Sequence, residues 1–161
     1  MPIRALESHH IESILAIQSA CPEIAQWTTW DYERAAQGEM AGWVSEHPTL
    51  GFQSDPNVRD ASDASSLNGF LVARRVATDM EILNFAVRPG ARRNGAGAAL
   101  LQSAMDWART FAAEHAILEV RSENETALRF YERHKFQIVG RRRDYYNSPT
   151  DDALLLTAHL V

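Results

Sequence analysis

The chain has 161 residues, 45% of them hydrophobic and 23% charged, which is the profile of a single globular domain. Its 16 lysines and arginines against 21 aspartates and glutamates give a formal net charge of −5, the opposite sign to that of a general nucleic-acid binder. The single cysteine, Cys21, excludes a disulfide framework, and no CxxC or HxxxH spacing predicts a metal site. No stretch approaches the roughly 18 apolar residues of a membrane span, and residues 1–7 lack the apolar run of a signal peptide, so we expect a cytoplasmic protein with no membrane partner.

The first third of the chain predicts short elements followed by a long loop. The expected elements are a strand at residues 3–6, a helix from residue 11 to about 21, a short helix from 30 to 38 and a strand at 43–44. Residues 47–68 have no apolar period and are rich in Ser, Asp, Pro and Gly. This composition predicts a long polar loop, either a functional lid or a disordered segment.

The remainder of the chain alternates strands and helices. Apolar runs at 70–73 and 80–87 predict a β-hairpin, which Pro89 and Gly90 terminate. The other expected elements are a long helix with apolar positions from Leu100 to Ala112, a strand at 117–120, a helix at 124–134, and closing strands at 137–146 and 153–160. This order predicts a single α/β or α+β domain over residues 1–161, with a mixed sheet and no internal repeats.

A glycine-rich turn, Arg92-Arg93-Asn94-Gly95-Ala96-Gly97, joins the strand at 80–87 to the long helix. Glycine lets a ligand approach the backbone closely, and it leaves the amides at the helix N-terminus free to bind an anion. The turn is not a Walker A loop, because no GxxxxGK[ST] occurs, and it fails the GxGxxG pattern because Leu100 stands at the third glycine position. It therefore predicts a phosphate cradle of another kind.

The run from Arg92 to Gly97 resembles the Arg/Gln-x-x-Gly-x-Gly/Ala signature of the GNAT superfamily of acetyl-CoA-dependent N-acetyltransferases. The segments that extend the resemblance are Glu119-Val120-Arg121, Asn124, Phe130-Tyr131-Glu132 and Arg142-Arg143-Asp144-Tyr145-Tyr146. They look like the RimI-type branch, which acetylates protein N-termini and is named for a ribosomal protein with an N-terminal alanine. The match extends from about Gly69 to the end of the chain.

The resemblance implies the GNAT fold, a mixed central sheet of about six to seven strands flanked by about four helices. It implies acetyl-CoA as cosubstrate, no metal, and a protein or peptide N-terminus as acceptor, with a ribosomal protein as one candidate. The cofactor-binding residues that it implies are Phe85, Ala86, Val87, Arg92, Arg93, Asn94, Gly95, Ala96, Gly97 and Asn124. The first three would present backbone groups to the acetyl and pantetheine arm, and the turn would hold the pyrophosphate.

The same resemblance implies Glu119 as general base and Tyr131 as general acid. An amine attacks a thioester only when neutral, so a carboxylate must accept a proton, and a phenol can return one to the departing thiolate. Glu81 is an alternative base, because other GNAT branches place theirs near the start of the strand at 80–87. Glu119 could instead be a salt-bridged surface residue, Tyr131 a core tyrosine and Asn124 a helix N-cap.

Four aromatic residues are candidates for acceptor binding. Trp27 and Trp30 are core residues by default, but the family places their segment at the border of the acceptor groove. Tyr145 and Tyr146 either line a peptide site or cover the sheet. The acceptor could also be a lysine side chain or a small-molecule amine, and the remaining alternative is a non-catalytic acyl-CoA-binding module.

One position departs from the family. Where the family commonly has Leu-Gly-Phe after its second motif helix, this chain has His134-Lys135-Phe136. Lysine thus occupies an expected left-handed C-cap position, which glycine adopts without penalty and lysine at a cost of about 1 kcal/mol.

Overall fold

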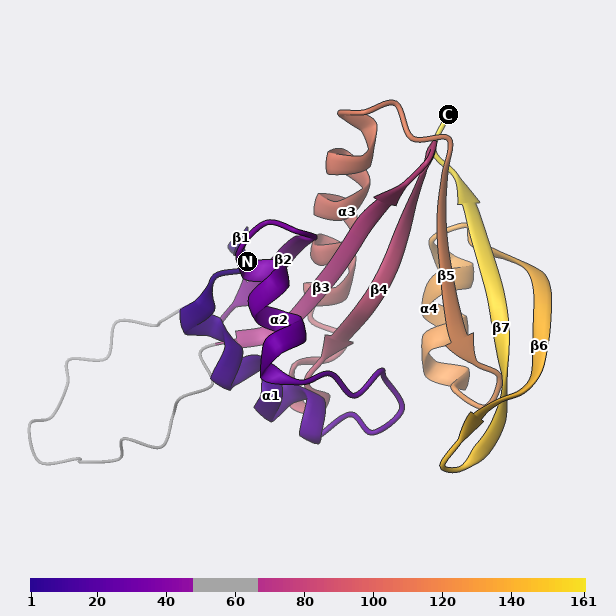
Figure 1. Cartoon of the computed structure of the whole chain (residues 1–161), viewed down its shortest axis with the longest axis horizontal. Coiled ribbons are helices and arrows are strands. Elements are labelled where there is room, and N and C mark those ends of the chain that lie inside the picture. Colours follow the sequence, from indigo (N-terminus) through magenta and orange to yellow (C-terminus); the bar gives the residue numbers. More distant parts are fainter. Residues whose placement is uncertain (48–66) are drawn as a thin grey trace, which may run out of the picture.

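The computed structural model describes residues 1–47 and 67–161 (Figure 1). Its elements are β1 (Ile3–Ala5), η1 (Ser8–His10), α1 (Ile11–Ser19), α2 (Thr29–Ala36), β2 (Ala41–Glu46), β3 (Leu67–Val76), β4 (Asp79–Val87), η2 (Pro89–Ala91), α3 (Ala96–Arg109), β5 (His115–Arg121), α4 (Glu125–Arg133), β6 (Gln137–Asn147) and β7 (Thr150–His159). The strands form one seven-stranded sheet in the order β1-β2-β3-β4-β5-β7-β6. Only β4 and β5 pair in parallel. The expected mixed sheet with four α-helices is confirmed for the described residues.

Helices α1 and α2 cover one face of the sheet, and α3 and α4 lie on the other (Figure 1). On the first face, Ile14 and Tyr32 pack with Phe70 of β3 in one buried cluster. On the second face, Leu100 of α3 and Leu118 of β5 belong to the other cluster. Because strand side chains alternate between faces, the residues on either side of Leu118 project toward the face of α1 and α2.

The expected loop over 47–68 ends earlier in the structure, because Leu67 and Asn68 belong to β3. Leu67 is fully buried, and the side-chain amide of Asn68 donates to the carbonyl of Glu46 at 3.3 Å. These two anchors extend the strand beyond the apolar run that marks it in the sequence. The rest of the expected loop, residues 48–66, lies outside the described residues.

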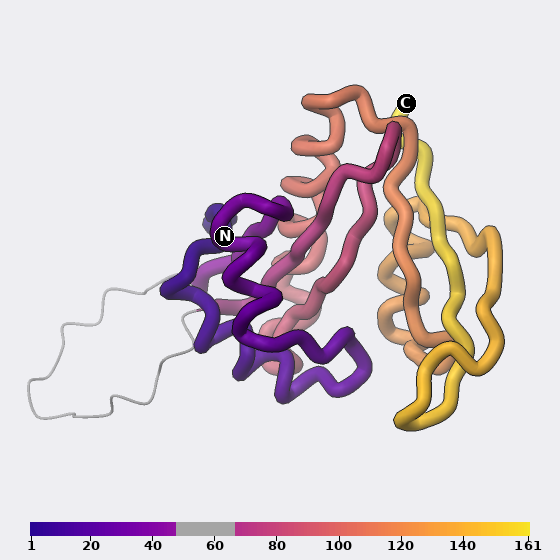
Figure 2. The backbone as a smooth tube through the Cα atoms, in the orientation of Figure 1, coloured from indigo at the N-terminus to yellow at the C-terminus, as the bar shows by residue number. Residues whose placement is uncertain are grey.

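Strands β4 and β5 separate after a short parallel contact. Their pairing covers Asp79–Glu81 and His115–Ile117. Just beyond it, the register of β4 against β3 shifts, so that Leu83 is an extra residue in β4. Such a bulge bends a strand and increases its twist. The two strands therefore diverge, as Figures 1 and 2 show for the gap between β4 and β5.

The C-terminus of α4 has the left-handed cap that the sequence predicts. Lys135 has φ 67. The amide of Lys135 donates to the carbonyl of Glu132 at 3.0 Å, and the amide of Phe136 donates to that of Tyr131, also at 3.0 Å. These two bonds form a Schellman motif, which ends the helix and turns the chain into β6.

Candidate active site

The glycine-rich turn places the N-terminus of α3 beside the end of β4, on the side that faces α4. Arg93 and Gly95 both have positive φ, 65 and 86, and α3 begins at the next residue, Ala96, without a side-chain cap. The first amides of the helix are therefore available to an anion, which the helix dipole also favours. A Cβ added at Gly95 would have no atom within 4 Å, so its backbone conformation, rather than crowding, favours glycine there.

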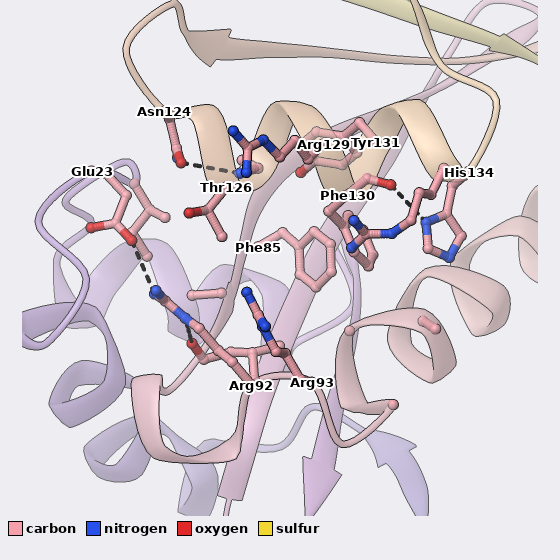
Figure 3. Close-up of a pocket in the computed structure, with 18 residues that line it drawn as sticks. Glu23, Phe85, Arg92, Arg93, Asn124, Thr126, Arg129, Phe130, Tyr131 and His134 are labelled. Carbon is pink, nitrogen blue, oxygen red and sulfur yellow. Dashed lines mark hydrogen bonds and ion pairs between the residues drawn. The ribbon is translucent and has the colours of Figure 1, made fainter.

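A cavity of about 660 Å³ lies beside the end of β4, between the glycine-rich turn and α4. Its walls come from β4, the turn and start of α3, helix α4, and the segment between α1 and α2 (Figure 3). The predicted cofactor residues that line it are Phe85, Ala86, Val87, Arg92, Arg93, Gly95, Gly97 and Asn124, joined by the predicted acid Tyr131. The predicted residues Asn94 and Ala96 do not line it, because Asn94 faces solvent and Ala96 is buried beneath the turn.

Gly97 lies where the first turn of α3 comes close to Phe130 of α4 and Val87 of β4. A Cβ there would lie 3.3 Å from Cε2 of Phe130 and 3.5 Å from Cγ2 of Val87. Helix α4 therefore approaches the first turn of α3 closely through Phe130. A branched side chain at position 97 would fill the space in front of the free amides.

Three contacts hold Arg92 in place, one to the end of β4 and two to the segment between α1 and α2. Its Nε donates to the carbonyl of Val87 at 3.1 Å, and its Nη2 lies 3.1 Å from Oε1 of Glu23 (Figure 3). The same Nη2 donates to Sγ of Cys21 at 3.5 Å. The arginine thus connects the turn to the segment between α1 and α2, 69 residues earlier in the chain.

Three aromatic rings form the inner wall. The ring centroids of Phe85 and Phe130 are 5.6 Å apart, and Tyr131 lies 6.3 Å from Phe85 and 5.4 Å from Phe130. Burial raises the pKa of Tyr131, so its phenol stays protonated. Tyr131 therefore belongs to the core and lines the cavity, which makes the two interpretations from the sequence compatible.

Asn124 also combines its two candidate roles. Its Oδ1 accepts from the amide of Ala127 at 3.2 Å as the N-cap of α4, and the residue lines the cavity. The cap uses only the carbonyl oxygen, so the side-chain NH2 group is still available as a donor to a ligand.

Glu119 does not line the cavity. Its neighbours Leu118 and Val120 are buried against α3 and α4, so Glu119 projects from the opposite face of the sheet. There its Oε1 lies 3.1 Å from Nε of Arg142 on β6. Burial, and next the charge of Glu119, raise the pKa of Tyr146, which places that phenol in the same cluster.

Glu81 occupies a different position along the sheet. It lies where β4 and β5 are still paired, and its Oε2 is 2.7 Å from Nη2 of Arg74 on β3. It does not line the cavity either. Glu81 and Glu119 are thus both strand glutamates with an arginine partner on the same sheet.

The predicted acceptor residues lie outside the cavity. Trp27 is half-buried against Tyr32, 5.3 Å between ring centroids. Trp30 is 67% exposed, so its default assignment to the core is wrong: its position in the first turn of α2 directs the ring to solvent. Tyr145 is 50% exposed, and Tyr146 stacks under the guanidinium of Arg121 at 4.2 Å.

A second cavity of about 500 Å³ adjoins the first. It lies between the segment after α1, the β5–α4 loop and the β6–β7 turn, and four residues line both cavities: Glu23, Arg92, Asn124 and Thr126. The Glu23–Arg92 ion pair therefore stands at the junction of the two spaces. Nothing local in the sequence marks Glu23, because its contact with Arg92 spans 69 positions.

Sequence analysis also missed two arginines of α4. Arg129 and Arg133 line the first cavity, one helical turn apart. Their four-residue spacing places them on one helix face, but Arg129 follows Asn124 by five residues, so no periodic pattern relates them to Asn124. Within residues 1–47 and 67–161, no group of His, Cys, Asp and Glu is arranged to hold a metal ion, and no helix there is long and apolar enough to cross a membrane.

The Acetyltransferase (GNAT) family model matches residues 11–136, and the chain belongs to this family. It is 31% identical over 145 residues to an uncharacterized protein of Mycobacterium leprae, an alignment covering 83% of this chain and 39% of that protein. It is 35% identical over 83 residues to the [ribosomal protein bS18]-alanine N-acetyltransferase of Escherichia coli, covering 52% of this chain and 55% of the enzyme. The chain thus spans about half or less of the length of these relatives.

Among solved structures, the fold is similar to that of Arabidopsis thaliana NAA60 in complex with acetyl-CoA. The TM-score is 0.80 at 18% sequence identity, and the superposition covers 98% of this chain and 97% of the other. At this identity the similarity concerns the fold alone.

Proposed function

We propose that residues 1–161 act as a single domain that transfers the acetyl group of acetyl-CoA to the α-amine of a protein or peptide N-terminus. The observation that carries this proposal is the cavity beside β4, walled by α4 and the glycine-rich turn, with the N-terminus of α3 opening into it. The uncapped amides of α3 favour an anion. The unpaired edge of β4 favours an extended chain beside it. Family membership and the named E. coli relative support the same chemistry.

The residues present fit acetyl-CoA. Glycine at position 97 leaves open the space that a Cβ would fill beside Phe130, next to the free amides of α3. Arg92 and Arg93 add positive charge at the same place. The aromatic wall offers an apolar surface to a thin organic chain.

When bound, acetyl-CoA supplies a thioester carbonyl as the electrophile. Glu119 accepts the proton of the incoming ammonium, directly or through water, so that the neutral amine can attack the carbonyl carbon. Tyr131, kept protonated by its burial, donates its phenolic proton to the departing sulfur. A backbone N–H of residues 85–87 stabilises the negative charge that develops on the carbonyl oxygen.

Proton energetics favour an α-amine over a lysine as acceptor. A model α-amine with a pKa near 7.8 costs about 1 kcal/mol to deprotonate at pH 7, whereas a lysine at about 10.4 costs nearly 5 kcal/mol. A single glutamate base meets the smaller demand more easily. The name of the E. coli relative makes a ribosomal protein a first candidate for the acceptor.

The test uses a peptide that carries both a free N-terminal alanine and an internal lysine. After incubation with acetyl-CoA and the enzyme, tandem mass spectrometry locates the acetyl group, and free CoA release measures turnover. We expect acetylation of the α-amine. Modification mainly of the lysine, or turnover only of a small polyamine or aminoglycoside, would contradict the N-terminal assignment, and binding of acetyl-CoA without turnover on a broad peptide panel would favour a non-catalytic module.

A further inference from the structure

The first cavity concentrates positive charge in an otherwise acidic chain. Its lining contains four arginines, Arg92, Arg93, Arg129 and Arg133, and one carboxylate, Glu23. The chain as a whole has a formal net charge of −5. The cavity therefore carries more cationic side chains than one ion pair can neutralise.

Three of these four arginines are not neutralised by a close partner. Arg92 is the one bound to Glu23. Arg129 lies 3.6 Å from Glu125, but both side chains are more than 70% exposed, so solvent screens this contact. Within the part of the chain that the structure describes, Arg93 and Arg133 take part in no ion pair.

These three arginines flank the predicted pyrophosphate position from two sides. Phe130 lies against Gly97 at the start of α3, and Arg129 and Arg133 are its neighbours on α4, on the wall that faces the turn. Figure 3 shows Arg93 rising from the turn toward α4, with Arg129 on the helix across from it. All three arginines are exposed, whereas Phe85 is half-buried and Tyr131 is buried, so the charged residues lie on the solvent side of the cavity and the aromatic rings form its inner wall.

We propose that Arg93, Arg129 and Arg133 form a second phosphate site, which takes the 3′-phosphate monoester of the CoA donor. This inference rests on the proposed function. The free amides at the N-terminus of α3, with the helix dipole, meet the pyrophosphate, whereas a phosphate monoester brings a further charge of about −1.5 to −2 and three acceptor oxygens. Guanidinium groups are the side chains that bind such oxygens best.

A protein with this site discriminates between CoA and dephospho-CoA, which lacks the 3′-phosphate. CoA and dephospho-CoA differ only in this group, so the ratio of their dissociation constants measures the site directly. We expect the wild-type protein to bind CoA at least about tenfold more tightly than dephospho-CoA. Binding is measured by isothermal titration calorimetry, which needs no knowledge of the acceptor.

The variant that tests the site is the double substitution Arg129→Gln and Arg133→Gln. It should lose most of the CoA preference while its affinity for dephospho-CoA changes less than about twofold. Arg109→Gln is the matched control, because Arg109 is an exposed helix arginine of α3 that pairs with Asp106 outside both cavities. This control should keep the wild-type ratio.

Two results would overturn the inference. Equal affinity of the wild-type protein for the two compounds would exclude a 3′-phosphate site. Equal weakening of both compounds in the double variant would assign the arginines to the pyrophosphate instead. Failure of both compounds to bind at all would contradict the proposed function, and is distinguishable from either result because the wild-type titration alone reveals it.

Discussion

Glu119 and Arg142 are joined by an ion pair of 3.1 Å that spans the intervening strand β7. The carboxylate proposed to accept the proton of the amine is thus held by a guanidinium on the sheet face opposite α3 and α4. An incoming ammonium group must compete with Arg142 for that carboxylate. This relationship makes Glu119 the first residue to test.

Replacing Glu119 by Gln should lower kcat by roughly 10²-fold, because the base is lost, with little change in acetyl-CoA affinity. Glu81→Gln is a matched control, since Glu81 is also a strand glutamate paired with an arginine and its loss removes a comparable ion pair. Steady-state kinetics on the peptide substrate measure both variants. If Glu81→Gln were the inactive protein and Glu119→Gln nearly normal, the two roles would have to be exchanged.

Tyr131→Phe removes one oxygen and preserves the ring that packs against Phe85, Phe130 and Phe136. The fold and acetyl-CoA binding should therefore be retained, while kcat falls by roughly 10²-fold because the proton donor for the leaving thiolate is missing. Kinetics together with a binding titration separate the two effects. Full activity of the phenylalanine variant would leave Tyr131 as a core residue only.

Gly97→Val should abolish the rise in melting temperature that acetyl-CoA produces. A ligand at a hundredfold excess over its dissociation constant stabilises the native state by about 2.7 kcal/mol, and this stabilisation raises the melting temperature. A branched side chain would meet Phe130 and Val87 and fill the space in front of the α3 amides. Gly90→Val is the control, because a Cβ at Gly90 has no atom within 4 Å. A folded Gly97→Val protein with a wild-type shift would refute the location of the cofactor.

Lys135→Gly should stabilise the protein by up to about 1 kcal/mol, because Lys135 has φ 67 and glycine adopts that conformation freely. The melting temperature should rise by roughly 2–4 °C for a chain of this size. Lys135→Ala keeps a Cβ and should bring no comparable gain. Equal stabilisation by alanine would show that removal of the lysine side chain, not backbone strain, is responsible.

Stability should fall as the pH drops below about 6.5. Burial, and next the neighbouring His9, lower the pKa of His10, whose Nδ1 accepts a hydrogen bond from the amide of Glu7 at 3.0 Å. The unfolded chain then binds the proton more strongly, so this contribution is complete above the unfolded pKa and is lost as the pH falls through the folded one. Melting temperatures at pH 7.5 and 5.5 should differ by roughly a few degrees more in the wild type than in His10→Gln.

His9→Gln serves as the control for this pH effect, because His9 is exposed. It should keep most of the wild-type dependence on pH. An unchanged pH dependence in His10→Gln would mean that other groups dominate the acid limb.

Most of the cavity lining contributed by β4 and the glycine-rich turn could be predicted from the sequence, whereas the contacts across the sheet could not. The turn from Arg92 to Gly97 and the residues 85–87 are continuous in the chain, so a local pattern is enough to identify them. The left-handed backbone of Lys135 was predictable for the same reason, because a helix C-cap is a local structure.

The contacts of Glu23 and Glu119 depend instead on tertiary neighbours. Glu23 meets Arg92 across 69 residues, and Glu119 meets Arg142 across another strand. No periodicity encodes such pairings. The start of β3 was missed because Asn68 is polar yet bonded within the sheet, which outweighs its low strand propensity.

The early separation of β4 from β5 gives the sheet an edge in its middle. From Ile82 onward, the described chain provides no strand to pair with β4 on its β5 side. Backbone groups there resemble those of an outermost strand, and Phe85, Ala86 and Val87 of this segment line the first cavity. A slender ligand with amide groups can complete the ladder at that position. The amides of Phe85 and Val87 face this unpaired side, because the pairing of Arg88 with Asn68 turns the alternate amides, including that of Ala86, toward β3. Amide hydrogen exchange at Phe85 and Val87 should then slow on ligand binding, while exchange at Ala86 remains as it is.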